Sequence, residues 1–276
     1  MTFGHNSVSY EVTLPDRALI VRTNANSKVF SGTAHNLSTL RELGLPVSKI
    51  IASDLTQTRY PSAYMILEKI PGRDLRYELS SMTPARKKRL AVQIVGYQGK
   101  VATLPPGDGF GYASIGEAAP FSSWRELVIS EICKDLLPDL EPSLASWRDR
   151  VFALAGRFTP HLEQVSPTCF LDDLTIKNVI VQDGELRGLI DFDGVCYGDP
   201  LWTLGLTAAA IIFDLGPDHL DYVEELYRAY CLDDTGRAVV SLYAALFALT
   251  FLARGNPTET DRMVRALEAW VEPLEH

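Results

Sequence analysis

The sequence lacks the signatures of several large enzyme classes. It contains no G-x-S-x-G nucleophile turn, no G-x-G-x-x-G dinucleotide fingerprint and no G-x-x-x-x-G-K-[ST] phosphate loop. Serine hydrolases, Rossmann enzymes and P-loop enzymes are therefore not indicated. Its five histidines are scattered without metal-ligand spacing, and its four cysteines include no C-x-x-C pair. Neither a zinc site nor a disulfide framework is predicted, and a reducing cytoplasm is the expected compartment.

No targeting or membrane-spanning segment is expected either. The first residues have neither the basic start nor the apolar run of a signal peptide. The longest apolar stretch, residues 238–253, is shorter than the roughly 20 residues of a transmembrane helix. It also contains Ser241, Tyr243 and Thr250. This stretch is predicted to be a buried helix, and no membrane partner is expected.

What is present is an acidic chain of ordinary composition. The 276 residues carry a formal net charge of −9, with 46% hydrophobic and 22% charged residues, which is typical of a folded globular protein. Nucleic acids and anionic membranes select basic surfaces, so neither is an expected partner. The charge is compatible with a cationic small-molecule substrate, although acidity for solubility alone is the simpler interpretation.

Hydrophobic periodicity divides the chain into a strand-rich first quarter and a helical remainder. A helix begins at Thr83-Pro84, another at Ser122, and the residues from Leu201 onward are helical and apolar. This order predicts an α+β fold. The elements predicted in the first quarter are strands at residues 7–14, 18–23, 47–52 and 63–68 and a helix at residues 33–43.

A hairpin is predicted in the middle of the helical part. Asp183-Gly184 favours a type I′ turn, because both of its central residues need positive φ. A turn there pairs Gln182 with Glu185 and brings Asn178 opposite Leu189. The open end of the hairpin therefore begins at Asn178.

Two carboxylates are expected beside that open end. Asp191 follows the second strand, and Asp173 lies in the loop that leads into the first strand, near Asn178. Carboxylate and amide oxygens suit Mg²⁺, which takes one or two carboxylates and completes its shell with phosphates and water. Phosphoryl transfer uses this arrangement, with a separate carboxylate that orients and deprotonates the attacking hydroxyl.

These residues form an ordered set of motifs. Asp173-x-x-x-x-Asn178 resembles the catalytic loop of protein kinases and aminoglycoside phosphotransferases, and Asp191-Phe192-Asp193 resembles their metal-binding D-F-G segment. Gly198-Asp199-Pro200 is similar to the G-D-P of aminoglycoside, choline and related small-molecule kinases, which protein kinases lack. The similarity runs from about residue 4 to about residue 210 and implies a two-lobed, protein kinase-like fold.

The resemblance also implies roles for the motif residues. Asp173 would be the catalytic base, Asn178 and Asp191 would hold Mg²⁺, and Asp199 would brace the catalytic loop. The segment Met65 to Gly72 looks like the hinge strand of these kinases. In it, Leu67, Glu68 and Ile70 are the positions whose backbone would hold the adenine of ATP, or the guanine of GTP.

By the same resemblance, residues 1–70 are expected to form the nucleotide-binding lobe. Residues 71–273 would form the helical lobe with the catalytic loop and the acceptor site. Arg22 stands where the phosphate-anchoring lysine is common, and arginine is a capable phosphate partner.

Several positions depart from the family pattern. The glutamate that usually pairs with the anchoring lysine is missing from the helix at residues 33–43, where His35, Asn36 or Ser38 fall near its place. Leu171 replaces the catalytic-loop histidine. Thr203 stands where Asp is usual after G-D-P. The expected phosphate-covering loop, residues 4–7, is not Gly-rich.

Asp172 stands beside the predicted base, where glycine is usual. A like charge nearby disfavours the ionisation of one of the two carboxylates. Asp172 is either a contact for a cationic acceptor or an ordinary loop carboxylate, and the second interpretation is the simpler. The other acidic acceptor candidates are Glu126, Glu131 and Asp135.

Two functions follow from these observations. The first is a phosphotransferase that moves the γ-phosphate of ATP or GTP to a hydroxyl of a small molecule, with aminoglycoside-type antibiotics, amino alcohols and sugars among the acceptors of the superfamily. The alternative is a nucleotide-binding pseudokinase or interaction module without turnover. It is suggested by the missing glutamate, by Leu171 and by the short N-terminal region.

Overall fold

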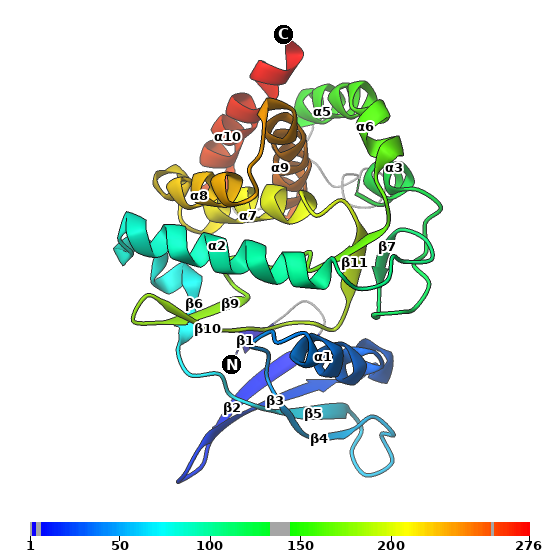
Figure 1. Cartoon of the computed structure of the whole chain (residues 1–276), viewed down its shortest axis with the longest axis vertical. Coiled ribbons are helices and arrows are strands. Elements are labelled where there is room, and N and C mark those ends of the chain that lie inside the picture. The colour runs from blue at the N-terminus through cyan, green and yellow to red at the C-terminus, as the bar shows by residue number, and fades with distance from the viewer. Residues whose placement is uncertain (1, 4–6, 133–143, 255–256) are drawn as a thin grey trace.

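The N-terminal part of the chain is an antiparallel sheet with one helix packed beside it (Figure 1). A computed structural model describes residues 2–3, 7–132, 144–254 and 257–276. The sheet has the strand order β1-β2-β3-β5-β4. Its strands are β1 (Thr2–Phe3), β2 (Val8–Thr13), β3 (Ala18–Asn24), β4 (Ile50–Asp54) and β5 (Ala63–Glu68).

Helix α1 (Thr33–Glu42) lies between β3 and β4 in the chain, after a short 3-10 turn at Ser27–Phe30. It buries Leu37 and Leu40. Gly44 ends it in a left-handed conformation, with φ of +76°. The predicted helix is thus confirmed in place and in its stop.

One strand prediction was displaced. The strand expected at residues 47–52 begins only at Ile50. Val47 instead makes an isolated parallel bridge with Leu189 of the later hairpin. The partner of Val47 is distant in the sequence, and the local pattern of apolar residues cannot reveal a distant partner.

The C-terminal part is mainly helical, which confirms the predicted α+β class. Helix α2 begins at Pro84 with Thr83 as its N-cap, as predicted, since the Thr83 hydroxyl accepts from the Arg86 N–H. The helices are α2 (Pro84–Val101), α3 (Trp124–Glu126), α5 (Ala145–Arg157), α6 (Thr159–Gln164), α7 (Trp202–Asp214), α8 (Asp221–Ala229), α9 (Asp234–Arg254) and α10 (Pro257–Glu275).

The helix predicted from Ser122 is irregular. After α3 the chain continues as a π-helical segment, Leu127–Ile132, and the rest of the prediction falls outside the described residues. Helix α9 packs against α7 and α10. Among the described residues it alone is long and apolar enough to cross a membrane, but 67% of that window is buried inside the molecule. It is therefore a core helix here, as predicted.

Two small sheets lie between the N-terminal sheet and the large helices (Figure 1). One has the order β10-β9-β6 and the other β7-β11-β8. Their strands are β6 (Arg73–Asp74), β7 (Gly111–Ala113), β8 (Thr168–Phe170), β9 (Val179–Gln182), β10 (Glu185–Leu189) and β11 (Val195–Gly198). Only β9 and β10 were predicted from the sequence.

The β9–β10 hairpin turns where the sequence predicts. Asp183 and Gly184 have φ of +57° and +72°, and Gln182 pairs with Glu185. A bulge at Arg187 then shifts the register by one, so Leu189 pairs with Val179 and not with Asn178. The Ile190 N–H donates to the Asn178 carbonyl (3.0 Å). The bulge brings Asp191 one residue nearer to Asn178 along the partner strand.

Glycine lets the segment after β5 pass close to this hairpin. Gly72 has φ of +115°, and a Cβ there would lie less than 3.0 Å from the Val181 carbonyl oxygen. At Gly188 a Cβ would lie less than 3.0 Å from the Pro46 carbonyl oxygen and against the side chain of Ile70. Both contacts require glycine, and together they fix the segment around Ile70 against β9 and β10.

Candidate functional site

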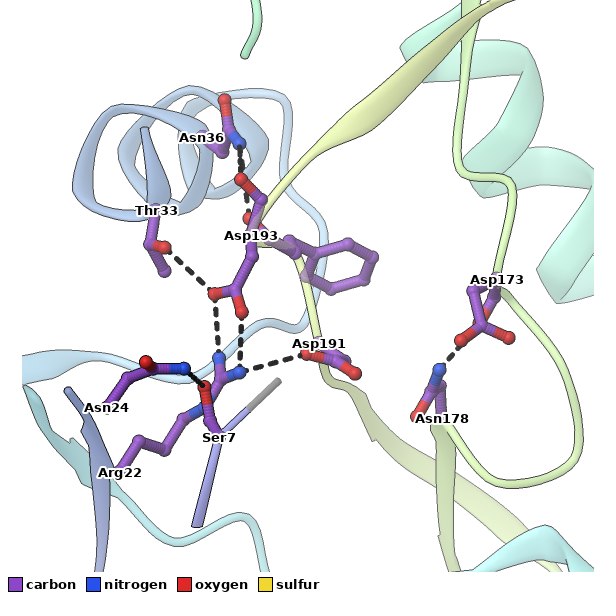
Figure 2. A network of polar contacts seen from close by, with 10 residues as sticks. Ser7, Arg22, Asn24, Thr33, Asn36, Asp173, Asn178, Asp191 and Asp193 are labelled. Atoms are coloured by element: carbon purple, nitrogen blue, oxygen red, sulfur yellow. Dashed lines mark hydrogen bonds and ion pairs between the residues drawn. The ribbon is translucent and has the colours of Figure 1, made fainter. Parts of the chain in front are cut away.

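The loop between β8 and β9 places Asp173 and Asn178 side by side (Figure 2). The Asn178 Nδ2 donates to the backbone carbonyl of Asp173 (2.8 Å), and the Thr175 hydroxyl donates to the Asp173 carboxylate (3.2 Å). Asn178 is 8% exposed, whereas the Asp173 side chain opens to solvent on one side. The amide nitrogen of Asn178 is thus used to shape the loop, which leaves its oxygen as a free acceptor.

Buried polar side chains anchor the start of this loop at Leu171. Gln98 on α2 makes two bonds to the Leu171 backbone, since its Oε1 accepts from the N–H (3.0 Å) and its Nε2 donates to the C=O (2.7 Å). The Thr203 hydroxyl donates to the same carbonyl (2.8 Å). All three residues are nearly fully buried. The two departures Leu171 and Thr203 therefore meet in one contact.

Asp191 follows β10 in a left-handed backbone conformation, with φ of +70°. Aspartate tolerates this region better than most residues, because its short polar side chain can bond locally. The side chain is half exposed. The conformation turns the chain sharply at the end of the hairpin, beside Asn178 and Asp173 (Figure 2).

Three carboxylates share this space and disfavour one another's charge. Burial, and then the charge of Asp191, raise the pKa of Asp173 to about 6. Burial, and then the charge of Asp173, raise the pKa of Asp172 to about 7. The pKa of Asp191 is raised by burial, against the neighbouring charge of Arg22. A cation bound among these carboxylates would reduce their mutual repulsion and favour their ionised forms.

The donor set fits a Mg²⁺ ion. The Asn178 amide oxygen and the Asp191 carboxylate are hard oxygen donors at the open end of the hairpin. Among the described residues, no cluster of three or more His, Cys, Asp or Glu side chains could cage a metal by itself. Mg²⁺ suits such an incomplete site, because it commonly takes few protein ligands and completes its shell with phosphate and water.

Arg22 on β3 reaches the segment from Asp191 to Asp193 from the N-terminal sheet. Its guanidinium binds the Asp193 carboxylate in bidentate fashion, with Nη1–Oδ1 at 2.8 Å and Nη2–Oδ2 at 2.6 Å. A longer contact joins Nη2 to Asp191 (3.2 Å). The same guanidinium lies over the ring of the buried Phe30, 5.3 Å from its centre. The sequence anticipated the position of Arg22 but not its carboxylate partner.

Helix α1 contacts the same segment through Thr33 and Asn36. The Thr33 hydroxyl donates to Asp193 Oδ1 (2.8 Å). The fully buried Asn36 donates to the backbone carbonyls of Phe192 (3.1 Å) and Asp193 (3.2 Å) and accepts from the Ile115 N–H (2.8 Å). Of the three residues suggested near the place of the missing glutamate, Asn36 alone makes these contacts, while His35 and Ser38 are exposed.

The predicted hinge positions lie at the end of β5. Leu67 is buried and pairs with Ile20 and Ile50, while the Glu68 N–H donates to the Lys49 carbonyl (2.8 Å). The backbone N–H of Ile70 has no partner among the described residues. It is therefore the free donor of this segment.

Asp199 is buried, and its hydrogen bonds run to the helical part of the chain. One carboxylate oxygen accepts from the Tyr243 hydroxyl (2.8 Å) and lies 2.8 Å from His161 Nε2. The Trp124 indole donates to Tyr243 (2.9 Å). The direct bonds to the predicted catalytic loop come instead from Gln98 and Thr203, so any support that Asp199 gives this loop is indirect.

The remaining candidates are less central. Glu126 accepts from the backbone N–H and hydroxyl of Ser122 (3.0 and 2.7 Å), which is a helix-capping contact. The side chain of Glu131 and all of Asp135 fall outside the described residues. So does most of the expected phosphate-covering loop, of which only Ser7 is described. Its hydroxyl accepts from Asn24 (3.3 Å).

Comparison with protein families gives a match over most of the chain. The model of the phosphotransferase enzyme family matches residues 4–243. No curated protein matches the chain.

Solved structures give a match over the whole fold. A thermostable mutant of aminoglycoside phosphotransferase APH(4)-Ia, in ternary complex with AMP-PNP and hygromycin B, has a TM-score of 0.72 at 14% identity, covering 99% of this chain and 92% of that one. APH(2")-IIia with GDP and kanamycin gives 0.69 at 16%, covering 100% and 90%. A putative fructosamine-3-kinase from Thermobifida fusca YX-ER1 gives 0.64 at 19%, covering 99% and 92%. The predicted kinase-like fold is confirmed.

Proposed function

The chain belongs to the phosphotransferase enzyme family, and on that basis we propose that it moves the γ-phosphate of ATP or GTP onto a hydroxyl group of a small molecule. Family and fold support a small-molecule phosphotransferase. The observation that carries the finer proposal is the convergence of Asp173, Asn178 and Asp191 at one end of the hairpin, within reach of Arg22 (Figure 2).

Each of these residues has a task in an in-line transfer. Asp173 accepts the proton of the acceptor hydroxyl as the new P–O bond forms and the bond to the leaving nucleoside diphosphate breaks. Its pKa of about 6 leaves it mostly ionised at neutral pH and able to accept that proton. Asn178 and Asp191 would hold Mg²⁺, which when bound neutralises charge on the phosphates. The guanidinium of Arg22 binds the phosphate oxygens.

The proposed nucleotide site lies between β3 and the segment after β5. The free N–H of Ile70 would donate to the base, with Leu67 and Glu68 forming the adjacent backbone. Relatives of the same fold have been solved with AMP-PNP and with GDP. Recognition through the backbone accommodates either purine, so both ATP and GTP belong in the assay.

The acceptor is proposed to be a hydroxylated small molecule that carries amines. Two structural relatives are complexes with hygromycin B and kanamycin. In this chain Asp172 adds a carboxylate next to the proposed base, and the net charge is −9. Cationic acceptors are attracted by such a field.

The lobe boundary is proposed at residues 70/71, because the N-terminal sheet ends with β5 at Glu68 and β6 pairs with the hairpin. Residues 71–273 would carry the catalytic loop and the acceptor site. The cytoplasm is the proposed location, with no nucleic-acid or membrane partner.

The alternative, a pseudokinase without turnover, loses one of its supports. It was suggested in part by the missing glutamate on α1, and Asp193 provides a carboxylate to Arg22 from another segment. The buried bonds from Gln98 and Thr203 likewise hold the catalytic loop at Leu171.

The test is nucleoside diphosphate release with Mg·ATP and with Mg·GTP. The acceptor panel holds aminoglycosides, other hydroxylated antibiotics, choline, sugars and amino acids. Acceptor-dependent release by the wild type, absent in Asp173→Asn, is expected. Nucleotide binding without release for any acceptor would favour the pseudokinase, and no nucleotide binding at all would contradict both functions.

A further inference from the structure

Two departures from the family pattern meet in one contact. Arg22 replaces the anchoring lysine, and α1 lacks the glutamate that would pair with it. In the folded chain, the two terminal nitrogens of the Arg22 guanidinium, Nη1 and Nη2, donate to the two carboxylate oxygens of Asp193, at 2.8 and 2.6 Å. The carboxylate that pairs with Arg22 therefore comes from the segment that follows Asp191 and not from α1.

Asp193 is also bound by the helix that lacks the glutamate. The Thr33 hydroxyl donates to the same oxygen that accepts from Arg22 Nη1. The Asn36 side chain donates to the backbone carbonyls of Phe192 and Asp193. Asp193 therefore joins three elements, β3, α1 and the segment after β10 (Figure 2).

Burial separates this ion pair from ordinary surface pairs. The side chains of Arg22 and Asp193 are 12% and 23% exposed, whereas Asp191 is 49% exposed. Phe30 covers the guanidinium on one side. A bidentate, largely buried arginine–carboxylate pair has fixed geometry, and removing one partner leaves an uncompensated charge. The longer contact to Asp191 is the one that can be given up when a ligand arrives.

We propose that Asp193 is a positioning residue that replaces the missing glutamate of α1, holding Arg22 for the nucleotide phosphates and fixing α1 to the Asp191 segment. This inference rests on the proposed function. Arginine suits this arrangement because its planar fork has five donors: two bind Asp193 and others remain for phosphate oxygens. Lysine, a point charge, lacks the fork that binds Asp193 in bidentate fashion.

A double-mutant cycle tests the pairing. Arg22→Gln, Asp193→Asn and the double variant are compared for Mg·nucleotide affinity, with a fluorescent ADP analogue as the probe, and for thermal unfolding without ligand. Each single variant is expected to weaken nucleotide binding by about tenfold or more, with the double variant no weaker than the worse single variant. Losses that simply multiply would overturn the proposal.

A matched control is the exposed ion pair Arg89–Glu185, which lies on α2 and β10. Arg89→Gln and Glu185→Gln remove the same charges outside the site. Both are expected to leave nucleotide affinity unchanged within about twofold, since exposed pairs contribute little. If they weaken binding as much as the site variants do, the effect is one of general charge and the proposal is wrong.

Moving the carboxylate back to the helix is a second test. Thr33 already lies 2.8 Å from the Asp193 carboxylate, so Thr33→Glu places an acid near the position that Asp193→Ala vacates. The combined variant is expected to regain about tenfold in nucleotide affinity over Asp193→Ala alone. If the combined variant is unfolded, the cycle above still decides.

The competing role for Asp193 is that of a metal ligand. If Asp193 is a metal ligand, Asp193→Asn will shift the Mg²⁺ dependence of nucleotide binding and Arg22→Gln will not. That result would overturn the positioning role. Coupling in thermal unfolding without coupling in nucleotide binding also overturns it. Failure to find any acceptor would contradict the proposed transferase. The double-mutant cycle would still test the role of Asp193, because nucleotide affinity and thermal unfolding are both measured without turnover.

Discussion

The candidate site holds three neighbouring carboxylates, those of Asp172, Asp173 and Asp191. Their mutual repulsion lowers the stability of the folded protein by a measurable amount. Burial and the charge of Asp173 raise the pKa of Asp172 to about 7 from an ordinary value of 3.8. The folded protein therefore keeps this proton to higher pH than the unfolded chain. The contribution of Asp172 to stability must fall as the pH rises from about 4 through about 7.

Asp172→Asn is accordingly expected to stabilise the protein, and to do so more at pH 8 than at pH 5. The gain in free energy of unfolding at pH 8 should be about 2 kcal/mol, allowing for solvent screening of a partly exposed group. Urea unfolding at both pH values measures it. Asp16→Asn, in the exposed turn between β2 and β3, is the control. If Asp172→Asn destabilises the protein at pH 8, the crowding argument is contradicted.

Single residues also mark the limit of what the sequence predicts. Spacing and motif order identified Asp173, Asn178 and Asp191, and the structure brings the three together. Nothing local identified Gln98, and Asn36 was only one of three residues named near the missing glutamate, because a buried polar side chain is recognised only by the distant backbone that it satisfies. Such residues become visible once the fold is known.

Among the elements, α2 holds the predicted catalytic loop through Gln98. Gln98→Leu removes one bond to the Leu171 N–H and one to its C=O, and Thr203 can replace only the second. The loss of stability should be about 2–3 kcal/mol, because a buried N–H loses its partner. Chemical unfolding measures it, and turnover should fall more than nucleotide affinity.

Gln93→Leu is the matched control for that variant. Gln93 lies on the same helix but is exposed, so the same substitution there should change stability by less than about 0.5 kcal/mol. Equal losses in the two variants would mean that helix propensity, and not the contact with Leu171, sets the effect.

A second element-scale prediction concerns the segment that joins β5 to the hairpin. Gly72→Ala adds a Cβ at positive φ against the Val181 carbonyl. We expect a loss of about 2–4 kcal/mol from strain and displaced backbone, together with weaker nucleotide binding. Thermal unfolding and nucleotide titration check the two effects.

Gly99→Ala makes the same change where there is room. Gly99 lies in α2 with nothing within 4 Å of the added Cβ. Alanine there should stabilise the protein by about 0.5–1 kcal/mol. A Gly72→Ala variant that is as stable as Gly99→Ala would show that the close approach of the two segments is not needed.

The hairpin shows why element prediction succeeds in part. The turn at Asp183-Gly184 depends on the φ preference of two adjacent residues, so it is readable from the sequence. The bulge at Arg187 depends on how the strand fits Val47 and Ile70 on its other sides, and it shifted the predicted partner of Leu189 from Asn178 to Val179. The short strands β8 and β11 give no alternation signal and were missed.

At the scale of the whole molecule, ligand binding should stabilise both halves together, because Arg22 and α1 join the N-terminal sheet to the Asp191 segment. A Mg·nucleotide at a hundred times its dissociation constant should add about 2.7 kcal/mol to the free energy of unfolding. A thermal shift with ATP or GTP measures this. EDTA, or AMP in place of the triphosphate, should remove most of the shift, and an equal shift with AMP would contradict a phosphate-centred site.

The overall fold was the most predictable feature and the pairing across it the least. The order of strands and helices predicted the α+β class, because each element is encoded locally, and the resemblance of the motifs implied the kinase-like architecture. The partner of Arg22 lies 171 residues away in the chain. Its identity depends on how two parts of the fold dock, which no pattern within either part contains.

The central claim is that Asp173 catalyses transfer of a nucleotide γ-phosphate to a small hydroxylated acceptor. Its most direct test uses γ-labelled ATP and GTP with the acceptor found in the release assay, and compares wild type with Asp173→Asn at matched nucleotide occupancy. The account predicts label on the acceptor with the wild type and at least about a thousandfold less with the variant. Equal labelling by both proteins, or label found only in free phosphate, would contradict it.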